Sequence, residues 1–363
     1  MSSGARYGIG AICVMWGVLL AGCHDGLKDL EDIPFEPTPY AIKDPADFTP
    51  MLVPEDNPMT AEGVALGRML FYDPILSRDS TVSCATCHHA DKAFTDGLPV
   101  SAGFGGRLGK RSALSLQNVG YFNTGLFWDG RSATLEEQSL HPVADSVEMA
   151  SSWPEAERKL RDHAEYPALF RKAFGIAKVE EINRTTVGKA LAQFERTLIS
   201  ADSRYDKVMR GAVRFTESER RGRQIFFDAE PGVLPTGECG HCHQPPMFSG
   251  LEYFNNGIDE IRDLTKVKDK GRGAVTGSVF DNGKFRSPSL RNIALTAPYM
   301  HDGRFQTLRQ VIDHYNEGGH YAENASPNVR LLHFSERDKA DLTAFLLTLT
   351  DTAFVRDPRF IHP

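Results

Sequence analysis

Two pentapeptides of the form Cys-x-x-Cys-His constrain this 363-residue chain more than any other feature. They span Cys84–His88 and Cys239–His243. In each, two thiols three positions apart can bond to the two vinyl groups of one porphyrin, and the adjacent imidazole can reach the iron from one face. The pattern predicts two covalently bound c-type haems, held by Cys84, Cys87, His88, Cys239, Cys242 and His243. Each iron keeps one further position, and the group that fills it decides the function.

Two other uses of paired cysteines fit less well. A four-cysteine zinc site usually has its pairs about 15 to 20 residues apart, whereas these pairs are separated by most of a domain. A thioredoxin-like dithiol needs one pair and no histidine directly after it. The histidine after both pairs therefore favours haem.

The composition is that of a soluble globular protein, with 41 % hydrophobic and 25 % charged residues. The formal net charge is −7, and no basic stripe is present, so nucleic acid is not an expected partner. A weakly acidic surface suits a small basic electron donor.

The first 23 residues predict an export signal. Arg6 precedes an apolar stretch over residues 9–20, and Leu20–Cys23 resembles a bacterial lipobox, so we expect Cys23 to be lipidated. A plain secretory peptide or an uncleaved anchor are the alternatives. All three predict a periplasmic protein. Residues 24–58, rich in Pro and Asp, are expected to form an extended tether.

The rest of the chain is an internal repeat. Gly67–Asp73 recurs as Gly222–Asp228, at the same distance before each Cys-x-x-Cys-His motif. Further blocks repeat in the same order: Ser115–Val119 as Ser289–Ile293, Phe127–Arg131 as Tyr299–Arg304, and Leu191–Leu198 as Leu342–Leu349. Helical periods are frequent and strand alternation is weak. We expect a mainly α fold of two tandem cytochrome c-like haem domains, over residues 59–211 and 212–363.

A tyrosine is one candidate for the sixth ligand of the second haem. Leu308, Val311, Ile312 and Tyr315 recur at helical spacing, so Tyr315 lies on the apolar face of its helix. A core tyrosine bonded to a carbonyl has the same spacing. The other candidate ligands are Met300, Met247 and His301.

The repeat predicts that the first haem is open. Its offset sets Pro142 opposite Tyr315, and proline cannot ligate iron. Gln138 and Glu148 flank Pro142. A carboxylate there could move a proton between the two oxygens of peroxide, and an amide could hold the peroxide, although either residue could equally be a solvated surface residue. Trp128 is a candidate relay between the haems or a core residue.

Several of these segments together resemble the bacterial dihaem cytochrome c peroxidase and MauG family. They are Phe71–Pro74, Cys84–His88, Phe127–Arg131, Glu148–Met149, Ser289–Asn292 and Thr296–Gly303. The resemblance implies a peroxidatic haem at His88 with Gln138, Pro142 and Glu148 on its distal side, Trp128 between the haems, and an electron-transfer haem at His243. Its sixth ligand is a methionine in the peroxidase branch and a tyrosine in the MauG branch, at the position of Tyr315.

Three positions depart from the family pattern. Ser112 stands where an asparagine usually binds calcium, which leaves the carbonyls of Thr296 and Pro298 as the implied calcium ligands. Gly103–Gly106 stands where many peroxidases carry a histidine that blocks the iron before reduction. Gly237–Glu238 replaces a surface tryptophan through which MauG draws electrons from its protein substrate.

The function expected from these residues is reduction of hydrogen peroxide by a dihaem peroxidase, with electrons from a small c-type cytochrome or a cupredoxin. The first alternative is a MauG-like enzyme that oxidises side chains of a partner protein. The second is a dihaem electron carrier without catalysis, which would need strong sixth ligands on both irons.

Overall fold

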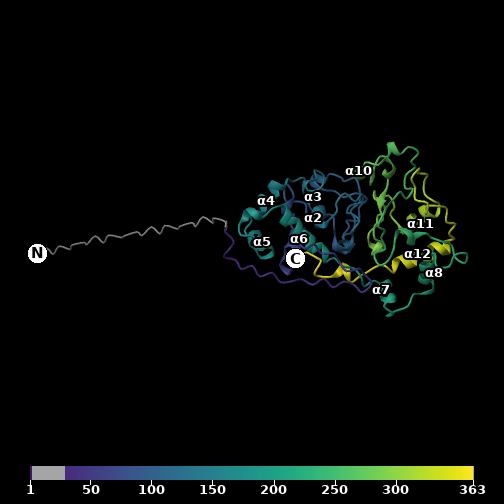
Figure 1. The fold of residues 1–363 in the computed structure, drawn as a ribbon, viewed down its shortest axis with the longest axis horizontal. Helices are drawn as coiled ribbons and strands as arrows, with labels where there is room; N and C mark the ends of the chain where they lie inside the picture. Colours follow the sequence, from purple (N-terminus) through teal and green to yellow (C-terminus); the bar gives the residue numbers. More distant parts are fainter. Residues whose placement is uncertain (2–28, 363) are drawn as a thin grey trace.

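The computed structural model describes Met1 and residues 29–362. The chain forms two halves side by side, with α1 to α6 in the first and α8 to α12 in the second (Figure 1). The α-helices are α1 Ala61–Tyr72, α2 Leu135–Gln138, α3 Leu140–Ala144, α4 Trp153–Asp162, α5 Tyr166–Phe174, α6 Arg184–Arg196, α7 Arg204–Met209, α8 Glu217–Phe226, α9 Cys239–Cys242, α10 Gly273–Thr276, α11 Leu308–Asn316 and α12 Glu336–Leu347. The predicted signal segment and Cys23 lie outside the described residues.

The mainly α expectation is confirmed. Within the described residues, β-structure with named strands amounts to the pair β1 (Tyr253–Phe254) and β2 (Phe285–Arg286), which run antiparallel. Short 3₁₀ turns and loops join the helices. Among the described residues, no helix combines the length and the apolar character needed to cross a membrane.

Each half is built around one close helix crossing. α1 meets α6 at Gly67, where an added Cβ would lie 1.9 Å from the Ala190 carbonyl oxygen. α8 meets α12 at Gly222, where an added Cβ would lie 1.9 Å from the Asp341 carbonyl oxygen. A side chain at either position would push the helices apart, so glycine permits the crossing.

The aromatic packing beside the two crossings is also alike. The rings of Phe71 and Phe194 lie 5.2 Å apart at 59°, and those of Phe226 and Phe345 lie 5.2 Å apart at 59°. All four side chains are buried. They form the centres of the two hydrophobic cores.

Both ends of the described chain run along the first half (Figure 1). Residues 29–58, predicted to be a tether, lie on the body, and Leu30 is buried and donates its N–H to the Ala177 carbonyl at 2.9 Å. The C-terminal residues, assigned from sequence to the second domain, return to the first core through Phe354 and Phe360. Arg68 donates to the Ile361 carbonyl at 2.7 Å. The chain ends thus add packing to the first half that the repeat did not predict.

Candidate functional site

The first attachment motif presents a neutral imidazole. Cys84–Thr86 forms a 3₁₀ turn, and His88 Nδ1 donates to the Phe94 carbonyl at 2.7 Å. Burial lowers the pKa of His88. With Nδ1 protonated and held, Nε2 carries the lone pair that a metal requires.

The second motif repeats this arrangement. The helix α9 carries Cys239 and Cys242, and His243 Nδ1 donates to the Phe248 carbonyl at 3.2 Å. Burial lowers the pKa of His243 to about 4. Phe94 and Phe248 both have positive φ, 65° and 51°, which turns each carbonyl towards its histidine.

These residues fit c-type haem. In the part of the chain that the structure describes, the four motif cysteines are thiols outside any disulfide. Burial raises the pKa of Cys87 and of Cys242 to about 11, so neither is held as a thiolate for a metal site. Two protonated thiols beside a neutral histidine form the donor set for two thioether bonds and one iron ligand.

The structure ties the loop that carries Glu148 back to the helix that carries Pro142. Pro142 lies in α3, and its carbonyl accepts the N–H of Met149 at 3.2 Å. The Glu148 N–H donates to Asp145 Oδ1 at 3.3 Å. Glu148 therefore follows the turn that leaves α3, close to the proline that the repeat offset singled out.

The Glu148 carboxyl has the electrostatics of a proton carrier. Desolvation raises its pKa, the Asp145 carboxylate raises it further, and Arg131 acts in the opposite direction. The Glu148 charge also raises the pKa of the Cys84 and Cys87 thiols, so the carboxyl lies in the neighbourhood of the first attachment motif. Its side chain still reaches solvent, which leaves a path for proton exchange.

Gln138 and the glycine-rich loop Gly103–Gly106 both belong to the first half. Gln138 ends α2 and is half-buried. Gly103 packs against the Glu148 loop so closely that an added Cβ would lie 2.1 Å from the Val147 carbonyl oxygen. The Phe104 N–H donates to the Glu148 carbonyl at 2.8 Å. The loop Gly103–Gly106 is thus fastened to the backbone of Glu148.

Trp128 lies at the junction of the two halves. Its indole Nε1 donates to the Ser112 carbonyl at 2.9 Å, and its carbonyl accepts the Arg286 N–H at 2.8 Å. Its ring meets that of His301 edge-on at 6.4 Å. The tryptophan therefore contacts residues of both halves, as a relay would require.

Ser112 joins the same junction to the second half. Its N–H donates to the His301 carbonyl at 2.8 Å, and its hydroxyl donates to the Met300 carbonyl at 2.9 Å. The hydroxyl is thus committed to a protein carbonyl, and it does not supply the carboxamide oxygen of the family's calcium site. The donor set fits calcium poorly, and Thr296 and Pro298 as calcium ligands stay a prediction.

Tyr315 and Met300 meet at one amide. Asn256 Nδ2 lies 3.2 Å from the Tyr315 hydroxyl oxygen and 3.3 Å from Met300 Sδ. Burial raises the pKa of Tyr315 to about 12, while the bond from Asn256 lowers it. The Cys242 and Cys239 thiols also raise the pKa of Tyr315, so the tyrosine lies in the neighbourhood of the second attachment motif.

The other two candidate ligands lie elsewhere. Met247 directly precedes Phe248, whose carbonyl holds the His243 ring from behind. The His301 ring stacks on Phe285 with centroids 3.8 Å apart, beside Trp128. Tyr315 and Met300 are therefore the pair that the geometry brings together.

Sequence reasoning missed two residues of this region. Asn256 belongs to no repeated block, so nothing in the sequence marked it. Glu195 is 4 % exposed, and its Oε2 has no hydrogen-bond partner among the described residues. Its charge acts on the Cys84 thiol. The internal repeat did contain a signal for Glu195. It aligns this acid with Leu346, so an ionisable residue stands where the other half has an apolar one.

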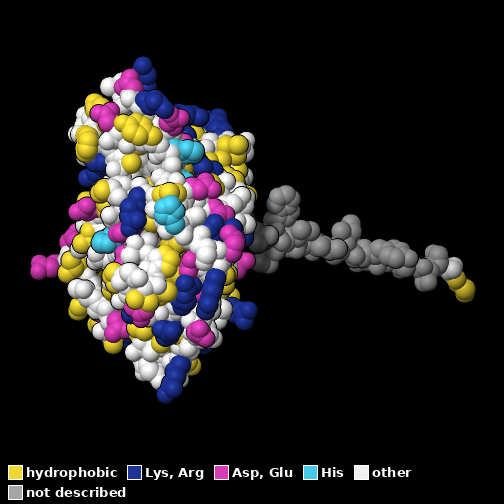
Figure 2. Space-filling model, turned by 90° about the vertical axis from the view of Figure 1, so that its right-hand side faces the viewer, with side chains coloured by type: hydrophobic (Ala, Val, Ile, Leu, Met, Phe, Trp, Pro, Cys, Tyr) yellow, Lys and Arg dark blue, Asp and Glu magenta, His cyan; other side chains and the backbone are white. Residues whose placement is uncertain are grey.

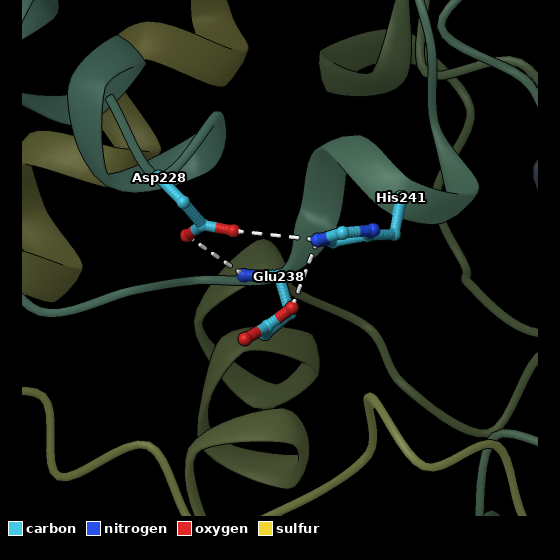
Figure 3. Close-up of side chains that lie close together, drawn as sticks. All are labelled: Asp228, Glu238 and His241. Carbon is cyan, nitrogen blue, oxygen red and sulfur yellow. Dashed lines mark hydrogen bonds and ion pairs between the residues drawn. The ribbon is translucent and has the colours of Figure 1, made fainter. Parts of the chain in front are cut away.

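A charged cluster lies just before and within the second motif (Figure 3). Asp228, Glu238 and His241 offer ligand-type atoms within 4.8 Å of one another. His241 Nε2 lies 3.0 Å from Glu238 Oε2, and the other oxygen of Glu238 pairs with Arg330 at 2.6 Å. Arg330 balances the Glu238 charge, and the bond from the Glu238 N–H to Asp228 Oδ1 at 3.2 Å links the three residues of the cluster to one another.

Comparisons with known proteins agree with this geometry. Residues 61–214 match the model of the family described as di-haem cytochrome c peroxidase. The chain is 35 % identical to the methylamine utilization protein MauG of Methylorubrum extorquens, over 82 % of this chain and 80 % of that protein. It is 32 % identical to the cytochrome c551 peroxidase of Pseudomonas aeruginosa, over 86 % and 85 %. A solved structure of a MauG-like protein associated with microbial copper homeostasis is 37 % identical, with a TM-score of 0.82 over 89 % of this chain and 99 % of that one.

Proposed function

The chain belongs to the bacterial di-haem cytochrome c peroxidase and MauG family, and we propose that within it this protein takes electrons from a small redox protein. Membership gives the chemistry: the protein carries two c-type haems and is a haem oxidoreductase that acts on peroxide. When bound at His88, the haem supplies the iron at which peroxide is reduced.

We assign the proton transfer of this reaction to Glu148. Its raised pKa suits a group that takes the proton from one peroxide oxygen and delivers it to the other. The Gln138 amide would hold the peroxide during this transfer. Two electrons and two protons then convert one peroxide to two waters, and Trp128, in contact with both halves, suits the passage of electrons between them.

The argument for a small electron donor depends on the surface just before the second motif. Glu238 there is ion-paired with Arg330 and lies 3.0 Å from His241 Nε2, where MauG carries a tryptophan. Drawing electrons from a bulky substrate protein requires a redox-active aromatic at the contact, whereas a small donor can bring its own cofactor close. Figure 2 shows apolar side chains between charges of both signs on the outer face of the second half, a surface suited to brief docking.

The competing function is MauG-like modification of a partner protein. Tyr315 favours it, because that branch uses a tyrosine at this position, and so does the lack of a histidine in Gly103–Gly106. A dihaem carrier without catalysis is disfavoured by Pro142, which cannot ligate the first iron.

The domain organisation and the cellular location are also proposals. The duplication into haem domains 59–211 and 212–363 is supported by the like crossings at Gly67 and Gly222. It is supported also by Asn118 and Asn292, which both have φ 56° in their repeated blocks. We place the protein in the periplasm, tethered through Cys23, on the strength of the first 23 residues alone.

The test mixes the holoprotein with peroxide and either a reduced c-type cytochrome or a reduced cupredoxin. A copper donor is included because one solved relative is associated with copper homeostasis. We expect two equivalents of donor oxidised per peroxide. If no small donor reacts, while a partner protein changes mass in a peroxide-dependent way, the modifier function stands instead.

A further inference from the structure

We propose that Asn256 is a positioning residue that selects Tyr315 over Met300 as the sixth ligand of the iron held by His243. The inference rests on the family's second haem and on the proposed role of Tyr315. It does not depend on which donor or substrate the enzyme uses.

The two acceptors share one donor group. A carboxamide nitrogen has two hydrogens, and Asn256 Nδ2 lies within hydrogen-bond reach of both the Tyr315 oxygen, at 3.2 Å, and Met300 Sδ, at 3.3 Å. The two candidate ligand atoms therefore lie around one point of the second half. Whichever atom ligates the iron does so beside this amide.

The amide is held in place from both sides. The Asn256 carbonyl accepts from His314 Nε2 at 3.0 Å, so consecutive residues of α11 bind the backbone and the side chain of Asn256. The preceding Asn255 is 1 % exposed and donates to Asn324 Oδ1 at 2.8 Å. Because these bonds fix the backbone around Asn256, its side-chain amide keeps one position, and the ligand must adapt to it.

The two acceptors differ in strength. A metal-bound phenolate oxygen carries negative charge and accepts a charge-assisted bond, whereas a thioether sulfur is a weak acceptor. The same amide therefore stabilises tyrosine ligation more than methionine ligation. A hydrogen bond to a charged group changes an equilibrium by roughly ten- to a hundredfold, so loss of the amide should shift the ratio of the two ligation states by about that factor.

Met300 is retained as the alternative ligand. Its φ is +76°, and its carbonyl is held by the Ser112 hydroxyl at 2.9 Å. The first half thus fixes the backbone of Met300 while its sulfur stays beside the Asn256 amide that also binds the Tyr315 oxygen. When the amide is lost, a second donor atom is already in place.

The test uses the full-length holoprotein without peroxide. Asn256→Leu keeps the size and removes both hydrogens, Asn256→Gln retains an amide, and Met300→Leu is the matched control. The readouts are the low-spin ferric signal in electron paramagnetic resonance and the midpoint potential of the second haem.

We expect Asn256→Leu to raise the potential and to convert the low-spin signal in part or fully to that of a histidine–methionine pair. Asn256→Gln should restore much of the original spectrum, and Met300→Leu should leave it unchanged. The double variant Asn256→Leu/Met300→Leu should lose the new signal.

An unchanged spectrum and potential in Asn256→Leu would overturn the proposal, as would a loss of the original low-spin signal in Met300→Leu alone. If Asn256→Leu does not fold, Asn256→Ser, which keeps a weaker donor, should give an intermediate shift, and no shift there rejects the proposal. Peroxide turnover with the small donors is measured separately, so failure of the proposed donor leaves this result intact.

Discussion

Glu195 should make the stability of this protein fall as the pH rises. The carboxyl is 4 % exposed, and its Oε2 finds no partner among the described residues. Burial raises its pKa from 4.5 to about 8; Arg196 opposes the rise and Glu136 adds to it. The native protein therefore holds a neutral acid at pH values where the unfolded chain carries a carboxylate.

The sign and size of the effect follow from these two pKa values. Below pH 4.5 both states are protonated and Glu195 has no effect on the pH dependence. Between 4.5 and about 8 the native state binds a proton that the unfolded state has lost, so the free energy of unfolding falls with pH. At roughly 1.4 kcal/mol per pKa unit, the upper limit of the loss is about 4 to 5 kcal/mol by pH 8.

The assay is denaturant unfolding of wild type and Glu195→Gln at several pH values between 4 and 8.5. The glutamine cannot ionise, so the variant should gain stability over wild type as the pH rises, by up to several kcal/mol, and the gain should vanish near pH 4.

Glu136→Gln is the matched control. Burial would raise the pKa of Glu136, but bonds from Arg196 and Asn57 outweigh burial and lower it. The Glu136 carboxylate lies 2.8 Å from the guanidinium of Arg196, whose side chain is only 4 % exposed. Removing the carboxylate would leave that buried charge unpaired, so the variant should lose about 3 to 5 kcal/mol of unfolding free energy at neutral pH. A difference between Glu195→Gln and wild type that does not change with pH would refute the reasoning.

Four further outcomes are expected. His88→Gly should abolish peroxide turnover while mass spectrometry still finds two haems, because Cys84 and Cys87 make the covalent bonds; retained turnover would contradict this assignment. Glu148→Gln should slow the reaction with peroxide, followed by stopped flow, by roughly 10² to 10⁴-fold, and a rate equal to wild type would mean a structural role. Tyr315→Met should raise the midpoint potential of the second haem, since a thioether donates less electron density than a phenolate; an unchanged potential would exclude Tyr315 as its ligand. Gly222→Ala should lower the free energy of unfolding by about 1 to 3 kcal/mol or more, because the added Cβ would lie 1.9 Å from a carbonyl oxygen of α12, and a neutral effect would show that the crossing can relax.

The sequence predicted well those features that depend on residues close together in the chain. A Cys-x-x-Cys-His motif fixes the distances between its own thiols and imidazole, so the covalent sites follow from five residues. The helical period over 308–315 likewise predicted the helix α11, observed as Leu308–Asn316. The repeat offset drew attention to Pro142 and Glu148, which the structure links through the Met149 N–H.

What the sequence missed depends on contacts between distant segments. Asn256 meets Tyr315 and Met300 across 59 and 44 positions of the chain. No local period constrains such a bond, because it forms only after α11 and the loop before it have packed. The return of Phe354 and Phe360 to the first core is of the same kind, since apolar residues near a chain end can cover either half.

The two halves share their framework and differ where they face the attachment motifs. Gly67 and Gly222 occupy matching positions, and a change at either would separate a helix pair, so packing holds both to one residue type. Other positions of the repeat have no such constraint. The first half has the buried Glu195 where the second has the buried Leu346, and the repeat sets Pro142 against Tyr315. A buried acid suits proton-coupled chemistry, and we propose that Pro142 leaves the first iron open for it, whereas an apolar wall and the Tyr315 ligand proposed above would suit electron storage. On this proposal, the division of labour between the haems would follow from a few side chains at matching positions of the two halves.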